Sequence, residues 1–135
     1  MSTLILIVDD EASNRQTLSR VLRREGYEII EAGNGQQALQ QLSKNPVLMI
    51  SDIKMPKLSG LELLKAARTH HPETEVILMT AYGTIDTAVE AMKLGAWDFI
   101  TKPIKRAELL RAVQRAIEKY ALSKENRELK DALSQ

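Results

Sequence analysis

The amino-acid sequence predicts an α/β fold in which helices cover both faces of a doubly wound, five-stranded parallel sheet. Short apolar runs recur along the 135 residues, and each is followed by a segment whose apolar residues have helical spacing. Such alternation is typical of βα units, in which a helix connects each strand to a parallel strand. The length, with 44% hydrophobic and 27% charged residues, suits one domain with a single core.

The five expected strands are the apolar runs at residues 4–8, 28–32, 47–50, 76–79 and 98–100. Five helices are expected on the apolar positions Leu18, Val21 and Leu22; Ala38, Leu39 and Leu42; Leu61, Leu63, Leu64 and Ala67; Ile85, Ala88, Val89 and Met92; and Leu109, Leu110, Val113 and Ile117. Residues that favour helix ends agree with this division. Gly26 and Gly95 lie where the first and fourth helices should end, and Pro46 and Pro72 closely follow the second and third.

Composition and charge argue against several classes of function. The formal net charge is +1 and the basic residues are scattered, so we expect no surface for nucleic acid or for an anionic membrane. The chain has no cysteine, which excludes a disulfide framework and a thiolate metal site. Its start lacks the positive region of a signal peptide, and its first apolar run is far shorter than the ~18 residues of a membrane span. We therefore expect a soluble, cytoplasmic protein.

Five polar residues come directly at the ends of expected strands. Asp9 and Asp10 end the first strand, Asp52 the third, Thr80 the fourth and Lys102 the fifth. Because the carboxyl ends of parallel strands meet at one edge of the sheet, these side chains should converge there. Two carboxylates about 4 Å apart repel by roughly 4 kcal/mol at an effective dielectric near 20, so a cation is expected between them. Oxygen ligands favour Mg²⁺ or Mn²⁺, and Mg²⁺ commonly bridges carboxylates to a phosphate.

Each of these residues also has an ordinary structural explanation. Asp9 and Asp10 could begin a loop, with Ser13 or Asn14 capping the next helix. Asp52 could be a turn residue, the Thr80 hydroxyl could be bonded to backbone, and Lys102 could be a solvated surface charge. Their joint position at one edge favours a site for a divalent cation and an anion.

Four segments together resemble the receiver domain of two-component response regulators: VDDEAS at 8–13, SDIKMPKLSG at 51–60, VILMTAYG at 76–83 and WDFITKPI at 97–104. The resemblance covers residues 4 to about 120, and the combination of its motifs is highly specific. It implies a flavodoxin-like sheet of strand order 2-1-3-4-5. It also implies a phosphorylation-activated signalling switch that depends on Mg²⁺.

The resemblance assigns Asp52 as the phosphoacceptor, which attacks the phosphohistidine of a partner sensor histidine kinase. It implies that Asp10 and Asp52 bind Mg²⁺ through their side chains, Lys54 through its backbone carbonyl, and Asp9 through a water. Gly60 would allow close approach of the backbone or a positive φ before the third helix.

Further roles follow from the same resemblance. Lys102 would pair with a phosphoryl oxygen, the Thr80 hydroxyl would donate to another, and the Ala81 amide would contact the same group. Phe99 matches the aromatic switch position that moves with Thr80. The peptide between Lys102 and Pro103 is expected to be cis.

Lys54 and Tyr82 match positions that tune the lifetime of the phosphoryl group in the family. The resemblance to a receiver domain also implies that the chain is not an enzyme, although it takes part in its own phosphorylation and slow dephosphorylation. An aspartyl-phosphate hydrolase is an alternative, but haloacid-dehalogenase-like phosphatases have a second acid where this chain has Lys54. A pseudo-receiver that needs no phosphate would be expected to lack one of the five polar site residues.

The end of the chain predicts a helical extension that forms a dimer. Residues 1–121 should form the receiver domain, and residues 122–135 should extend its last helix. Leu122, Asn126, Leu129 and Leu133 are spaced by four, three and four residues, which is the a/d spacing of a parallel two-stranded coiled coil. We expect a homodimer, with a solvated single helix as the alternative because two heptads are marginal alone.

The final helix and the segment 79–103 also resemble the receiver and linker of NtrC-like, sigma-54-dependent transcriptional activators. In those proteins an ATPase domain and a DNA-binding domain follow, and this sequence shows neither. DNA and RNA polymerase would then be reached only through an absent output domain, without nucleic-acid contact by this segment. A stand-alone receiver that acts through protein contacts is the alternative.

Overall fold

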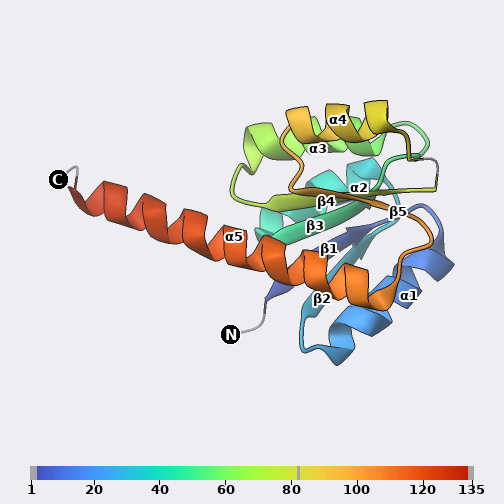
Figure 1. The fold of residues 1–135 in the computed structure, drawn as a ribbon, viewed down its shortest axis with the longest axis horizontal. Helices are drawn as coiled ribbons and strands as arrows, with labels where there is room; N and C mark the ends of the chain where they lie inside the picture. The colour runs from blue at the N-terminus through green and yellow to red at the C-terminus, as the bar shows by residue number, and fades with distance from the viewer. Residues whose placement is uncertain (1–2, 82, 134–135) are drawn as a thin grey trace.

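Strands and helices alternate in the computed structural model, which describes residues 3–81 and 83–133 (Figure 1). Their bounds are β1 (Leu4–Val8), α1 (Ala12–Arg24), β2 (Glu28–Ala32), α2 (Gly35–Gln41), the 3-10 turn η1 (Leu42–Lys44), β3 (Leu48–Asp52), α3 (Gly60–His70), β4 (Glu75–Thr80), α4 (Ile85–Lys93), β5 (Asp98–Thr101) and α5 (Arg106–Leu133). Gly26 and Gly95 follow α1 and α4 with φ of +91° and +102°, as helix-ending glycines do.

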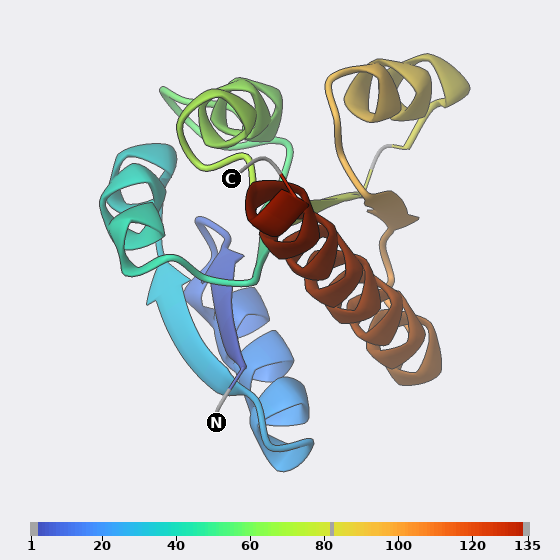
Figure 2. The ribbon, with the colours of Figure 1, turned by 90° about the vertical axis from the view of Figure 1, so that its left-hand side faces the viewer.

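The five strands form one parallel sheet of order β2-β1-β3-β4-β5, which confirms the predicted fold class. Helices α1 and α5 cover one face of the sheet, and α2, α3 and α4 cover the other (Figure 2). Because the chain order reverses between β1 and β3, the carboxyl ends of these central strands lie at the topological switch point, where doubly wound folds place their ligands.

The core lies on both faces of the sheet, because alternate residues of each strand point to opposite sides. In β1, Ile5 and Ile7 pack with α1 and α5, whereas Leu6 and Val8 pack with α2 and α3. All four side chains are fully buried. A central strand that is apolar on both faces is typical of a parallel sheet, and it holds the end of β1 firmly in place.

Strands β3, β4 and β5 continue past the ends of the apolar runs that predicted them, although β3 begins at Leu48, one residue later than predicted. Asp52 is the last residue of β3 and pairs in register with Met79. Thr80 ends β4 and pairs with Thr101, and Glu75 begins the same strand. The backbone ladder continues through polar residues because its hydrogen bonds do not depend on the side chain. The sheet itself therefore fixes the backbone of the site residues.

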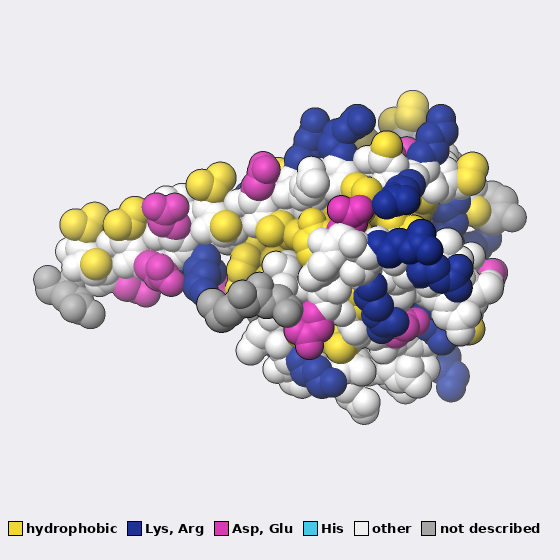
Figure 3. All heavy atoms as spheres, turned by 90° about the horizontal axis from the view of Figure 1, so that it is seen from below, with side chains coloured by type: hydrophobic (Ala, Val, Ile, Leu, Met, Phe, Trp, Pro, Cys, Tyr) yellow, Lys and Arg dark blue, Asp and Glu magenta, His cyan; other side chains and the backbone are white. Residues whose placement is uncertain are grey.

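Helix α5 is the longest element, and its C-terminal part projects beyond the rest of the domain (Figure 1). Hydrophobic side chains are exposed along this projecting part (Figure 3), where Leu122, Leu129 and Leu133 are 61%, 55% and 85% exposed. Among the described residues, no helix combines the length and hydropathy that crossing a bilayer requires.

Candidate functional site

Three carboxylates meet at the carboxyl edge of the sheet. Asp9, Asp10 and Asp52 each offer one carboxylate oxygen, and these oxygens lie within 4.8 Å of one another. Asp9 is fully buried and Asp52 is only 8% exposed, whereas Asp10 is exposed to solvent. The cluster is thus deep on the side of β1 and β3 and open on the side of Asp10.

Lys102 places its ammonium between the two buried members of this cluster. Its Nζ lies 3.3 Å from Oδ2 of Asp9 and 3.2 Å from Oδ2 of Asp52, and donates to both. Partial burial lowers the pKa of Lys102, but the charges of Asp52 and Asp9 and their hydrogen bonds outweigh it, so that its pKa lies above the usual value. Lys102 is therefore a permanent cation at this edge.

The backbone around Asp9 fixes its carboxylate. Oδ1 of Asp9 accepts a hydrogen bond from the Glu11 amide at 2.9 Å, and the Asp9 amide donates to Ala32 on the neighbouring strand. Arg15 donates to the Asp9 carbonyl at 2.6 Å. The alternative in which Ser13 or Asn14 caps α1 is wrong, because the N-cap is Glu11, whose side chain caps no amide. The Asp9 carboxylate instead accepts a backbone amide, that of Glu11, at the start of this helix.

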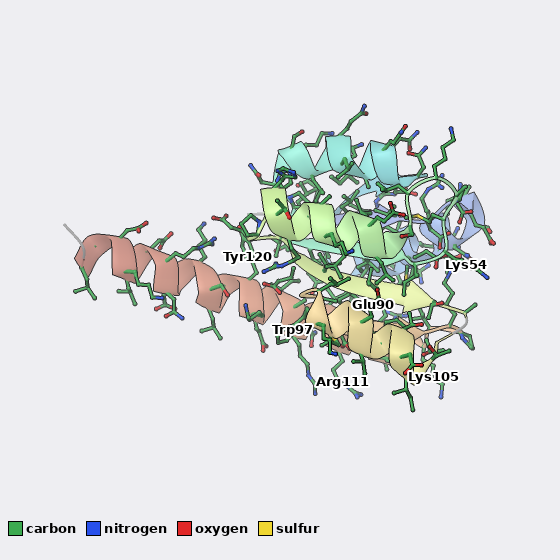
Figure 4. All side chains as sticks on the ribbon, turned by 90° about the horizontal axis from the view of Figure 1, so that it is seen from above. Lys54, Glu90, Trp97, Lys105, Arg111 and Tyr120 are labelled. Atoms are coloured by element: carbon green, nitrogen blue, oxygen red, sulfur yellow. The ribbon has the colours of Figure 1, made fainter. Side chains whose placement is uncertain are left out.

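The loop after Asp52 folds back tightly against it. The Gly60 amide donates to the Ile53 carbonyl at 2.8 Å, and a Cβ at Gly60 would lie 2.3 Å from the carbonyl oxygen of Asp52. The predicted close approach at Gly60 is therefore confirmed, whereas the alternative of a positive φ is wrong for this residue. The Lys54 amide donates to Oδ1 of Asp52 at 3.4 Å, so the backbone at Lys54 is beside the carboxylate cluster. Figure 4 shows that Lys54 and Lys105 lie at this end of the sheet and that Tyr120 lies near its opposite end, where α5 leaves the domain.

The ends of β4 and β5 bring the remaining polar groups to the same edge. Thr80 is 4% exposed, and its carbonyl accepts from the Lys102 amide at 2.7 Å. Ala81 lines a hollow of about 490 Å³ together with Asp9 and Lys102. The peptide between Lys102 and Pro103 is cis, as the resemblance implies.

The other predicted site residues are not members of the carboxylate cluster. Phe99 on β5 is half-buried and packs against the cluster between the sheet and α2, α3 and α4. Tyr82 lies outside the described residues. The four heptad residues 122, 126, 129 and 133 lie on the projecting part of α5, away from the carboxylates.

Sequence reasoning overlooked Arg15. Besides holding the Asp9 carbonyl, its Nε lies 3.5 Å from Oε1 of Glu31, which ties α1 to the edge strand β2. The available signal was its position one helical turn after the acidic residues 9–11, from which a long side chain can reach back to them.

The donor set fits a hard divalent cation. Three carboxylates meet here, and the Lys102 ammonium contacts two of them, Asp9 and Asp52. Carboxylate oxygens are ligands that Mg²⁺ and Mn²⁺ prefer. The described residues near this edge can therefore hold a metal ion and, beside it, an anion paired with Lys102.

Comparison with known proteins identifies the family to which this fold belongs. The family described as "Response regulator receiver domain" matches residues 5–114. The chain belongs to this family. The receiver domain is also 44% identical over 131 residues to the regulatory protein AtoC of Escherichia coli, a match that covers 96% of this chain and 28% of AtoC. It is 41% identical over 118 residues to the DNA-binding transcriptional regulator NtrC of the same species, covering 87% of this chain and 25% of NtrC.

A solved structure of NtrX from Brucella abortus superposes on the receiver domain with a TM-score of 0.88 and 37% sequence identity, covering 96% of this chain and 30% of NtrX. The predicted resemblance to NtrC-like regulators is confirmed. The chain spans less than a third of the length of each of these relatives.

Proposed function

We propose that this receiver domain is a phosphorylation-activated switch, which accepts a phosphoryl group on Asp52 from a sensor histidine kinase with the help of Mg²⁺. The observation that carries the proposal is the position of the Lys102 ammonium between Asp9 and Asp52 within the carboxylate cluster. A partly buried cation beside a nearly buried carboxylate is suited to a nucleophile that receives a highly charged group.

Asp52 is the acceptor in this proposal. One of its carboxylate oxygens forms a bond to phosphorus while the bond between phosphorus and the histidine nitrogen breaks. Asp52 is held for this step by the end of β3 and by the backbone of the loop at Gly60. The backbone before and after Asp52 is fixed, so its carboxylate needs little reorganisation before attack.

Asp10 and Asp52, with the carbonyl of Lys54, are the residues that would hold Mg²⁺, and Asp9 would act through a water. When bound, the ion neutralises charge on the carboxylates and on the incoming phosphoryl oxygens. Asp9 keeps its orientation through the Glu11 amide, while its second oxygen accepts from Lys102 within the site.

Lys102, Thr80 and Ala81 are proposed to stabilise the phosphoryl group. The Lys102 ammonium moves from Asp52 to a phosphoryl oxygen as the carboxylate loses its charge, and the Thr80 hydroxyl and Ala81 amide bind other oxygens. Movement of Thr80 toward the phosphoryl group gives Phe99 room to turn inward, which is the proposed switch. Lys54 and Tyr82 are proposed to set how long the phosphoryl group survives.

We also propose an output. NtrC is described as a DNA-binding transcriptional regulator, and the present chain matches about a quarter of it. The extension at residues 122–135 would then connect the receiver domain, residues 1–121, to an output domain that controls transcription. Its exposed leucines would pair with those of a second copy in a parallel coiled coil.

Incubation with acetyl phosphate and Mg²⁺, followed by intact-mass measurement, tests the proposed phosphorylation. We expect one phosphoryl group per chain, lost when EDTA replaces Mg²⁺. A chain that hydrolyses acetyl phosphate over many turnovers without accumulating the adduct would favour a hydrolase. A chain that neither accumulates nor consumes it would favour a pseudo-receiver.

A further inference from the structure

A buried carboxylate lies at the end of the sheet opposite the phosphorylation site. Glu75 begins β4, and its side chain is only 7% exposed. An ionised carboxylate in such a position is costly unless a cation accompanies it. The cation is Lys119 of α5, whose Nζ lies 3.5 Å from Oε1 of Glu75.

Lys119 lies where α5 leaves the body of the domain. It precedes Tyr120, which Figure 4 shows at the end of the sheet opposite Lys54. Its ammonium also donates to Oγ of Ser123, one turn further along the helix, at 2.8 Å. Glu75 is thus connected through Lys119 to the first turn of the projecting part.

A second ion pair lies further out on the same helix. Arg127 contacts Glu73, which lies in the connection between α3 and β4. These groups surround a cleft of about 360 Å³, which Arg68, Asn126 and Lys130 also line. Glu73 in this connection and Glu75 at the start of β4 therefore bind two cations of α5 that are eight positions apart.

The binding face and the leucine face of α5 are adjacent. Ser123, Arg127 and Lys130 have the spacing of one helical face, and they line the cleft. Leu122 and Leu129 each directly precede a residue of that face, and the three leucines together centre about 100° around the helix axis from it. They remain exposed. When one face is fastened to the domain, the direction of the other is fixed.

We propose that Glu73 and Glu75 form an ionic latch that fastens the projecting part of α5 to its own receiver domain and sets the direction of the exposed leucines. The latch acts within one chain and needs neither phosphorylation nor a second copy. Glu75 and Thr80 are the two ends of β4, so a single buried strand connects the latch to the phosphorylation site. A displacement of β4 therefore acts directly on the anchor of the helix.

Hydrogen exchange of the amides of residues 121–133 tests the latch by charge exchange. Glu73→Arg places two arginines opposite each other without changing the sequence of α5, and should make these amides exchange about two- to fivefold faster, as loss of an exposed ion pair implies. Arg127→Glu should have a similar effect. The double variant Glu73→Arg/Arg127→Glu restores opposite charges and should exchange more slowly than either single variant.

All variants are compared in a Leu129→Asp background, so that protection by a dimer is not mistaken for the latch. Lys124→Glu is the matched control, since Lys124 is an exposed cation of the same segment with no ion pair to any residue that the structure describes. Unchanged exchange in Glu73→Arg would overturn the proposal. So would a double variant that exchanges as fast as the faster single variant.

Discussion

The ammonium of Lys102 lies 3.2 Å from Oδ2 of Asp52, although the two residues are 50 positions apart in the sequence. The pair joins the ends of β3 and β5, which are not neighbours in the sheet, across the end of β4. Lys102 therefore has two roles in our account. It offsets carboxylate repulsion when no phosphoryl group is present, and it binds the phosphoryl group when one arrives.

Replacement of Lys102 by methionine should destabilise the domain most in the absence of metal. The change leaves Asp9 and Asp52 without their cation, and we expect a loss of about 1–2 kcal/mol in the free energy of unfolding. Urea unfolding in EDTA and in saturating Mg²⁺ measures this, with Lys105→Met as the control for an exposed lysine. Mg²⁺ should stabilise the Lys102 variant more than wild type, and equal stabilisation of both would contradict the account.

Asp10→Asn should weaken Mg²⁺ binding far more than Glu11→Gln. Of these two residues, only Asp10 contributes an oxygen to the carboxylate cluster, whereas the Glu11 carboxylate accepts a hydrogen bond from Asn14. Loss of one direct ligand should reduce affinity about tenfold or more, which corresponds to roughly 1.4 kcal/mol. Calorimetric titration of the two variants compares them directly, and similar affinities would show that Asp10 is not a ligand.

Gly60→Ala should disturb the site through the backbone. The added Cβ would lie 2.3 Å from the Asp52 carbonyl oxygen and 2.7 Å from Cα of Ile53. Neither atom can yield without moving the backbone that carries Asp52, so we expect a loss of about 1–3 kcal/mol in stability. Phosphorylation by acetyl phosphate should slow as well. Wild-type unfolding and wild-type phosphorylation rates together would contradict this role of Gly60.

Much of this site was predictable because its residues follow a simple rule. Parallel strands end at one edge, so the polar residues that end apolar runs had to meet there, and Asp9, Asp52 and Lys102 do. The strand bounds were less accurate, since apolar runs stop at polar residues while the backbone ladder includes Asp52 and Thr80.

Other features depend on tertiary contacts that spacing does not encode. In the sequence Arg15 does not differ from an exposed helical arginine, and only the fold shows its hydrogen bond to the Asp9 carbonyl. The burial of Glu75 could not be predicted either, because an acidic residue beside an apolar run is usually exposed. Its ion pair with Lys119 of α5 explains how a carboxylate can be buried there. Long charged side chains reach many partners, so their pairing requires the fold.

The projecting part of α5 should associate with a second copy. Leu122, Leu129 and Leu133 are more than half exposed on one face, and Asn126 lies at the heptad position that favours two strands in register. Sedimentation at micromolar concentration should show a dimer that Leu129→Asp dissociates. A chain that stays monomeric with Leu129 intact, phosphorylated or not, would rule out the coiled coil.

The position of the phosphoryl group tests the central claim most directly. After reaction with acetyl phosphate and Mg²⁺, borohydride reduction of the acyl phosphate marks the modified residue, and peptide mass spectrometry locates it. Our account predicts a single mark at Asp52, absent from Asp52→Asn and present in the control Asp98→Asn. A mark at another carboxylate in the wild-type chain, or equal labelling of Asp52→Asn, would contradict it.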